Sequence, residues 1–364
     1  MAEETPSALP CVRLFGGAAG VALAPRLLLW LVSWLPLVAL TGLSSPAAMS
    51  TFLMDAEALA RLLIGMPALL LGGTYVDRHL TRGVHDLYQS ELLPRSTCDP
   101  VARQLSRWGS GWVLRALLLG IVAAALSMTA LEDSSFALRG WRQAGEGYSP
   151  AGAWYRWIST PAYRYLWLRL VWGLIVWLGV IGLVARLLEP CLLHPDRRGG
   201  LGRFVLAHAA FAPLVFGLSS SAAGSLANQL LYRGRTLEDV QLLLIGFIVM
   251  IQLPILATPL PLIVPLYREK QRTLERLSKV AVPWARLVAP YLAERLPPPS
   301  PNTHDLAAHA DLIATYTVID ETSIIPLRKN VVLTLALFTA LPMLPVILIG
   351  VPLSEILVRV TKLL

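Results

Sequence analysis

Hydrophobic residues gather along this chain in long runs that alternate with polar segments. At a rise of about 1.5 Å per residue, each run is long enough to cross, or nearly cross, a hydrocarbon core about 30 Å thick. The pattern predicts an all-α polytopic membrane protein with about seven transmembrane helices, the last broken by proline. The predicted spans are 27–43, 58–76, 112–131, 163–187, 204–228, 240–267 and 331–351.

The polar segments between the runs divide the chain and predict its orientation. Seventeen Lys and Arg residues fall in the loops on one side of the predicted topology and five on the other, which places the N-terminus in the cytoplasm. The expected organisation is a cytoplasmic N-terminus (1–26), two spans (27–76), a cytoplasmic helical segment (77–111), a four-span core (112–267), a cytoplasmic amphipathic segment (268–330) and a C-terminal membrane segment (331–364).

Composition supports lipid as the main solvent of the chain. It is 55% hydrophobic and only 15% charged, whereas soluble domains carry about a quarter charged residues. The net charge of +8 lies in particular loops, so we expect partners in the lipid bilayer and its anionic headgroups and none among nucleic acids.

Aromatic and basic residues near the ends of the predicted spans are expected to lie at the membrane interface. Trp141, Trp154 and Trp157 lie in a predicted external loop, where indole rings favour the headgroup level. Arg61 lies near one end of its span and is expected to extend toward the interface.

One face of span 204–228 is lined by small and polar residues. Gly217, Ser221, Gly224 and Asn228 follow at steps of four, three and four, which places them on one side of a helix. Such a stripe favours close helix packing. The alternative is a face that lines a pore or a substrate site, for which Ser221 and Asn228 are the candidates.

Proline interrupts spans 240–267 and 331–351. Each interior proline frees a backbone carbonyl, which only protein or water can satisfy within a membrane. Kinks that shape the bundle are the favoured interpretation, and a binding site between discontinuous helices is the alternative. Gln252 and Thr258 are the polar candidates for such a site.

The loop 188–202 contains the sequence His-Pro-Asp-Arg-Arg-Gly-Gly-Leu-Gly, from His194 to Gly202. Its glycines precede a helix, and a helix N-terminus with adjacent arginines can bind phosphate. A tight turn whose arginines contact anionic headgroups is the favoured interpretation. The residues concerned in either case are Arg197, Arg198, Gly199 and Gly200.

Five of the six histidines fall in predicted cytoplasmic segments, each with an aspartate within two positions. Imidazole and carboxylate together could hold a divalent cation such as zinc or manganese. The spacing of strong metal motifs is missing, which favours solvated His–Asp pairs. The candidate ligands are His79, His85, His194, Asp196, His304 and His309.

Three pieces of sequence carry a resemblance: 154–169, the loop from His194 to Gly202, and 325–357. Together they resemble a group of bacterial multi-pass inner-membrane proteins to which no function is assigned. The resemblance implies the bacterial cytoplasmic membrane and implies no activity, so no functional residue follows from it.

These features favour an oligomeric pore or carrier for a small solute or ion, expected to be a homo-oligomer. The spans hold no acidic residue at mid-depth, which disfavours a proton relay. Familiar catalytic motifs are missing from the sequence, which disfavours an enzyme. The alternatives are a metal-dependent membrane enzyme that uses the cytoplasmic His and Asp groups, and a scaffold or sensor that binds a cytoplasmic partner.

Overall fold

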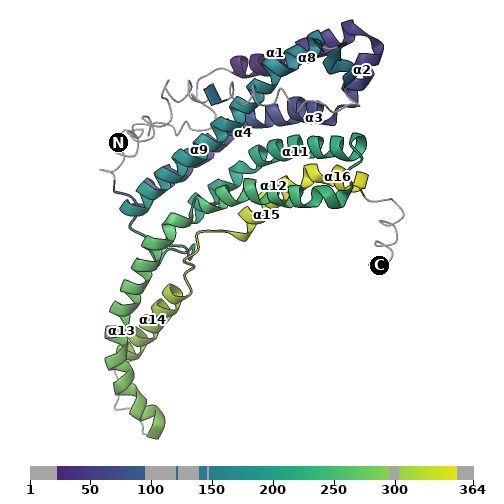
Figure 1. Ribbon diagram of the computed structural model, residues 1–364. Helices are drawn as coiled ribbons and strands as arrows, with labels where there is room; N and C mark the ends of the chain where they lie inside the picture. Colours follow the sequence, from purple (N-terminus) through teal and green to yellow (C-terminus); the bar gives the residue numbers. More distant parts are fainter. Residues whose placement is uncertain (1–22, 95–119, 122–138, 146, 295–302, 351–364) are drawn as a thin grey trace, which may run out of the picture.

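The computed structural model describes residues 23–94, 120–121, 139–145, 147–294 and 303–350. Within these residues the fold is all-α, apart from one two-stranded antiparallel ribbon between β1 (Gln143–Ala144) and β2 (Gly147–Tyr148). Long helices run side by side as a bundle, and one helical pair extends away from it (Figure 1).

The first half of the bundle contains two π-helical turns, each continuous with the α-helix that follows it. The π turns are η1 (Ala60–Gly65) and η5 (Tyr155–Ser159). The α-helices are α1 (Leu23–Ser44), α2 (Pro46–Leu53), α3 (Ala56–Leu59), α4 (Met66–Gln89), α7 (Arg139–Arg142), α8 (Pro150–Trp154) and α9 (Thr160–Leu187).

The second half is joined by short 3₁₀ turns in place of π turns. These are η6 (Ala207–Phe211), η7 (Leu260–Leu262) and η8 (Leu341–Met343). The α-helices are α10 (Gly202–Leu206), α11 (Ala212–Tyr232), α12 (Leu237–Ala257), α13 (Ile263–Glu294), α14 (Thr303–Asp320), α15 (Lys329–Ala340) and α16 (Leu344–Gly350).

Six continuous helical stretches among the described residues are long and apolar enough to cross a membrane. They correspond to six of the seven predicted spans, and the predicted span 112–131 lies almost entirely outside the described residues. The chain is therefore a multi-pass α-helical membrane protein. The six stretches are Arg26–Ser44, Ala56–Gln89, Pro150–Leu187, Gly202–Tyr232, Leu237–Pro283 and Lys329–Ile349.

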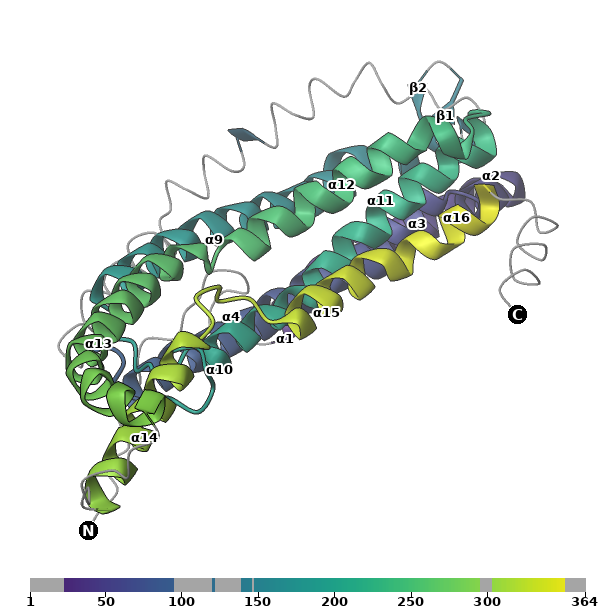
Figure 2. The same cartoon turned by 90° about the horizontal axis from the view of Figure 1, so that it is seen from below.

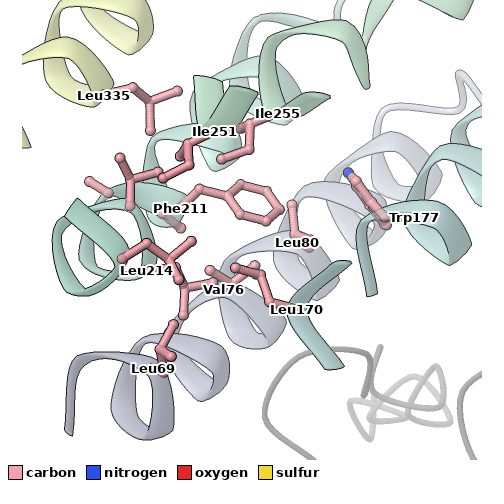
Figure 3. Close-up of a cluster of buried hydrophobic side chains, with 14 of the residues drawn as sticks. Leu69, Val76, Leu80, Leu170, Trp177, Phe211, Leu214, Ile251, Ile255 and Leu335 are labelled. Carbon is pink, nitrogen blue, oxygen red and sulfur yellow. The ribbon is translucent and has the colours of Figure 1, made fainter. Parts of the chain in front are cut away.

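The continuous helical stretch Gly202–Tyr232, which consists of α10, η6 and α11, is the centre of the bundle. In the most apolar part of Gly202–Tyr232, 78% of the residues are buried, against 17% in that of Leu237–Pro283. Its last part, α11, contacts α3, η1, α4, α12, α15 and α16. Figure 3 shows how Phe211 and Leu214 meet side chains from α4, α9, α12 and α15, among them Val76, Trp177 and Leu335.

Glycines let α11 approach the helix α3–η1 at backbone distance. A Cβ atom on Gly224 would lie 2.4 Å from the carbonyl oxygen of Ala56 in α3, and one on Gly217 would lie 3.0 Å from the carbonyl oxygen of Gly65 in η1. Small residues at such spacing allow this contact between membrane helices. The two glycines of the stripe therefore serve packing, as the favoured interpretation predicted.

The prolines of the two interrupted spans produce short 3₁₀ turns. The sequence Leu-Pro-Leu forms η7 between α12 and α13, and Leu-Pro-Met forms η8 between α15 and α16. A helix resumes directly after each turn. The prolines thus shape continuous spans, and Figure 2 shows α15 and α16 following one another along the bundle.

Beyond η7, α13 leaves the bundle and packs against α14 (Figures 1 and 2). Lys270 connects the two, because its Nζ donates to the carbonyl oxygens of Asp320 and Thr322. We call this side of the bundle the α13 end, and the opposite side, where α3 begins and α11 ends, the Asp55 end.

Substitution of Gly224 by alanine tests the close approach. We expect Gly224→Ala to lower the free energy of unfolding by about 1–3 kcal/mol, because the new methyl group has to displace the backbone of Ala56. Thermal unfolding in detergent measures the change. Gly246→Ala on α12 is the control, since nothing lies within 4 Å of a Cβ atom there; an equal loss in both variants would contradict the packing role.

Candidate functional site

A fully buried carboxylate organises the Asp55 end of the bundle. Asp55 is the N-cap of α3 and has no solvent exposure. Its Oδ2 accepts hydrogen bonds from Arg142 Nη2 at 2.5 Å and Trp141 Nε1 at 3.2 Å, and its Oδ1 accepts one from Asn228 Nδ2 at 2.9 Å. A buried ion pair is stable only with such additional hydrogen bonds, so these four residues form one unit.

Asn228 completes this unit from α11. Its Oδ1 accepts a hydrogen bond from the backbone N–H of Ala56 at 3.1 Å, while its Nδ2 donates to Asp55. Both ends of the amide are thus used within the protein. Asn228, predicted as a lining residue, lies buried in a contact between α11 and the start of α3.

A second cation, Arg61, is partly buried on η1. Arg61 forms an ion pair with Glu57 one turn earlier and donates from Nη1 to the Tyr155 hydroxyl at 2.8 Å. Its guanidinium lies 5.5 Å from the ring centre of Tyr163, within the range of a cation–π contact. Arg61 is therefore held by groups of the protein, and its position relative to the membrane interface stays a prediction.

The two π turns supply this arrangement. Arg61 belongs to η1 and Tyr155 to η5, and the guanidinium of Arg142 stacks 5.0 Å from the Tyr155 ring centre. π turns are rare in proteins overall, and those that occur are often found at functional sites. Trp141, also in contact with Tyr155, is only 1% exposed and packs within the protein, whereas Trp157 is 62% exposed. The level of these rings relative to the headgroups stays a prediction.

A partly open cavity of about 280 Å³ lies beside Arg61 and between η1, α9, α11 and α12. Most of the cavity surface is apolar and includes Trp167, Leu218, Phe247 and Met250. Residues with two guanidinium groups and three hydroxyl groups complete the lining. The polar lining residues are Arg61, Tyr163, Arg164, Ser221 and Ser225.

Ser221 is the one predicted lining residue that reaches this cavity. The other candidates lie elsewhere: Gln252 donates from Nε2 to Thr339 Oγ1 at 2.9 Å, which joins α12 to α15. Thr258 is buried and donates to the carbonyl oxygen of Ile255 at the end of α12. The structure therefore does not gather the four predicted residues into one site.

The His-Pro-Asp loop is built around its own carboxylate. Asp196 accepts hydrogen bonds from the backbone N–H groups of Arg198 (2.9 Å), Gly200 (3.1 Å) and Gly202 (2.7 Å). Gly202 begins the long helix, so Asp196 occupies the place that an external anion would take. Burial acts to raise the pKa of Asp196, but these hydrogen bonds and that of His194 outweigh it and hold the pKa below its usual value.

The arginines of this loop contact the protein itself. Arg197 forms an ion pair with Glu321 at 2.9 Å, and Arg198 donates from Nη1 to the carbonyl oxygens of Ile325 and Leu327. Gly199 and Gly200 have φ values of +66° and +88°, which favour glycine in this turn. The four residues predicted to bind phosphate or headgroups thus lie in a turn that joins α9, α10 and the segment before α15.

The predicted metal ligands do not converge where the structure describes them. In the described part of the chain, no three His, Cys, Asp or Glu side chains lie close enough to hold a metal ion. His79 and His85 lie on α4, and His194 pairs with Asp196. The backbones of His304 and His309 belong to α14, and their side chains lie outside the described residues.

Comparisons with protein-family models, with curated proteins and with solved structures found no match to this chain.

The amino-acid sequence gives little sign of the Asp55 unit or of the cavity. Asp55 and Glu57 precede an apolar run, and Glu57 and Arg61 have the i, i+4 spacing of a helical ion pair. That spacing is the sequence feature that indicates the Glu57–Arg61 ion pair. The pairing of Asp55 with Arg142 joins residues 87 positions apart, for which the sequence carries no local sign.

Removal of the Asp55 charge tests the buried unit. We expect Asp55→Asn to lower the free energy of unfolding by about 3–5 kcal/mol, because Arg142 loses its buried counter-charge. Thermal unfolding in detergent reports the loss. Asp311→Asn on the exposed face of α14 removes the same charge and should cost little; an unchanged Asp55→Asn protein would contradict this role.

The low pKa of Asp196 predicts an acid-sensitive loop. A lowered pKa contributes stability above the ordinary value of about 4, and that contribution disappears as the pH falls through the folded-state pKa. Protease cleavage in the loop 188–202 should therefore increase below about pH 4 in the wild type. Asp196→Asn should be cleaved at pH 7 already and respond less to acid, and identical profiles would contradict the assignment.

Proposed function

We propose that this chain is a pore or carrier for a small anion and works as a homo-oligomer. The observation that carries the proposal is the cavity between η1, α9, α11 and α12, lined by Arg61, Arg164 and hydroxyl groups. Arginine within a membrane bundle is costly and is retained where it binds a solute or stabilises the protein.

The charges of this region favour an anionic solute. Asp55 and Glu57 balance Arg142 and Arg61, so each carboxylate is matched by one guanidinium. Arg164 also belongs to the cavity wall, so two guanidinium groups line the cavity. The Tyr163 and Ser221 hydroxyls are hydrogen-bonded to one another. The remaining hydroxyl hydrogen of this pair and that of Ser225 can be donated to an anion that has left water.

The depth of the cavity supports a path through the membrane. Met250, on its wall, lies 13 residues inside α12, which begins at Leu237 and is apolar over most of its length. At 1.5 Å per residue this is about 20 Å along the helix axis. A solute in the cavity would therefore lie about 20 Å from the start of α12, measured along its axis.

The proposed setting is the bacterial inner membrane with the N-terminus in the cytoplasm. The Lys and Arg bias of the loops supports this orientation, and the resemblance to bacterial inner-membrane proteins supports the compartment. The α13–α14 pair would then project into the cytoplasm.

That projecting pair favours a second candidate function, a scaffold or sensor that binds a cytoplasmic partner. α13 and α14 pack on one another and extend beyond the bundle (Figure 1). In this case the cavity would have no role in flux, so a measurement of anion flux into proteoliposomes separates the two functions.

Flux of small anions into proteoliposomes tests the cavity. We expect Ser225→Leu to reduce the flux because the larger side chain fills the cavity, and Arg164→Gln to reduce it because a positive charge is lost. A unit charge about 10 Å away at an effective dielectric of about 20 contributes about 1.7 kcal/mol, a little over tenfold in occupancy.

Gly246→Leu is the matched control for Ser225→Leu. Gly246 lies on α12 with nothing within 4 Å of a Cβ atom and does not line the cavity. Flux should persist in this variant. Wild-type protein that carries no anion above empty liposomes, or a Ser225→Leu protein with full flux, would overturn the proposal.

A further inference from the structure

A larger pocket, of about 730 Å³, lies at the α13 end of the bundle. One wall is the last turn of α9 with the link that follows it, from Gly182 to Pro190. The other wall is η7 and the first turns of α13, from Pro261 to Arg272. The pocket therefore lies where α13 leaves the apolar part of its span.

Three arginines line this pocket without carboxylate partners. They are Arg186 on α9 and Arg268 and Arg272 on α13. Among the described residues, none of the three forms an ion pair within 4.0 Å. Glu189 and Glu269 also line the pocket, so its lining carries a surplus of one positive charge.

These arginines differ from those of the neighbouring loop. Arg197 is paired with Glu321, and Arg198 is hydrogen-bonded to two carbonyl oxygens. The loop arginines are thus engaged within the protein. Those of the pocket present exposed guanidinium groups to its interior.

An apolar track leads to the arginines on each wall. On α9, Leu178 and Gly182 precede Arg186 at steps of four, and Leu178 is 43% exposed. On α13, Val264 precedes Arg268 and Arg272 at the same step and is 50% exposed. Residues at this spacing share one helix face, so both faces pass from exposed apolar surface to arginine.

We propose that this pocket binds the phosphate group of an anionic phospholipid. Its arginines would contact the phosphate oxygens, and the acyl chains would lie along the apolar tracks of α9 and α13. Basic pockets between membrane helices bind such headgroups. The tracks favour a lipid over free phosphate, because a soluble anion would gain nothing from them. The site is separate from the cavity beside Arg61 and does not depend on anion flux.

Lipid-dependent stability of the purified full chain tests this proposal. We expect phosphatidylglycerol added to detergent to raise the unfolding temperature of the wild type, and phosphatidylcholine or inorganic phosphate to have little effect. In Arg268→Gln/Arg272→Gln, the affinity for phosphatidylglycerol should fall about 30-fold, from the contribution of each arginine near a lipid surface. Native mass spectrometry should show the corresponding loss of bound lipid.

Arg276→Gln/Lys279→Gln is the matched control. Both residues are exposed on the next turns of α13, and neither lines the pocket. This variant loses the same charge and should keep the lipid effect. Arg186→Gln, on the opposite wall, should weaken binding about fivefold and tests the site independently of α13.

Three results would overturn the proposal. The first is an undiminished phosphatidylglycerol effect in both Arg268→Gln/Arg272→Gln and Arg186→Gln. The second is an equal loss in the Arg276→Gln/Lys279→Gln control, which would indicate general surface charge. The third is full stabilisation by inorganic phosphate, which would indicate a free anion in place of a lipid.

Discussion

The approach of α11 to α3 and η1 is the contact on which the bundle depends. Gly217 and Gly224 remove the side chains that would separate these backbones. Asn228, one turn further along α11, then reaches both the Asp55 carboxylate and the Ala56 amide. With a side chain at Gly224 the hydrogen bonds of Asn228 would lengthen, so packing and polar contacts at this point are coupled.

This contact also positions the two cations Arg142 and Arg61. Asp55 is held in place by α11 and in turn holds Arg142, whose guanidinium stacks on Tyr155. The Tyr155 hydroxyl accepts from Arg61. One buried carboxylate thus orders a chain of groups that ends at the cavity wall, where Arg61 would meet a solute under the proposed function.

Much of the fold was predictable because lipid imposes a simple pattern on the chain. Long apolar runs identified the spans, and the small residues of α11 indicated close packing. The polar sites were harder to predict, because their partners are distant in sequence: Asp55 joins Arg142 and Asn228, and Arg197 joins Glu321. A helical stripe in the sequence includes Ser221, which lines the cavity, but nothing local indicates that Arg61 and Arg164 line it too.

The Asp196 carboxylate has a further consequence for the His-Pro-Asp loop. It is tethered six residues from the Gly202 amide that it accepts from, so its effective concentration at this helix N-terminus is on the order of millimolar or more. A soluble anion would have to compete for the Gly202 amide with the Asp196 carboxylate, which is covalently attached to the same chain. The loop therefore satisfies the N-terminus of the central helix with its own carboxylate. Its glycines are explained by the positive φ values of the turn.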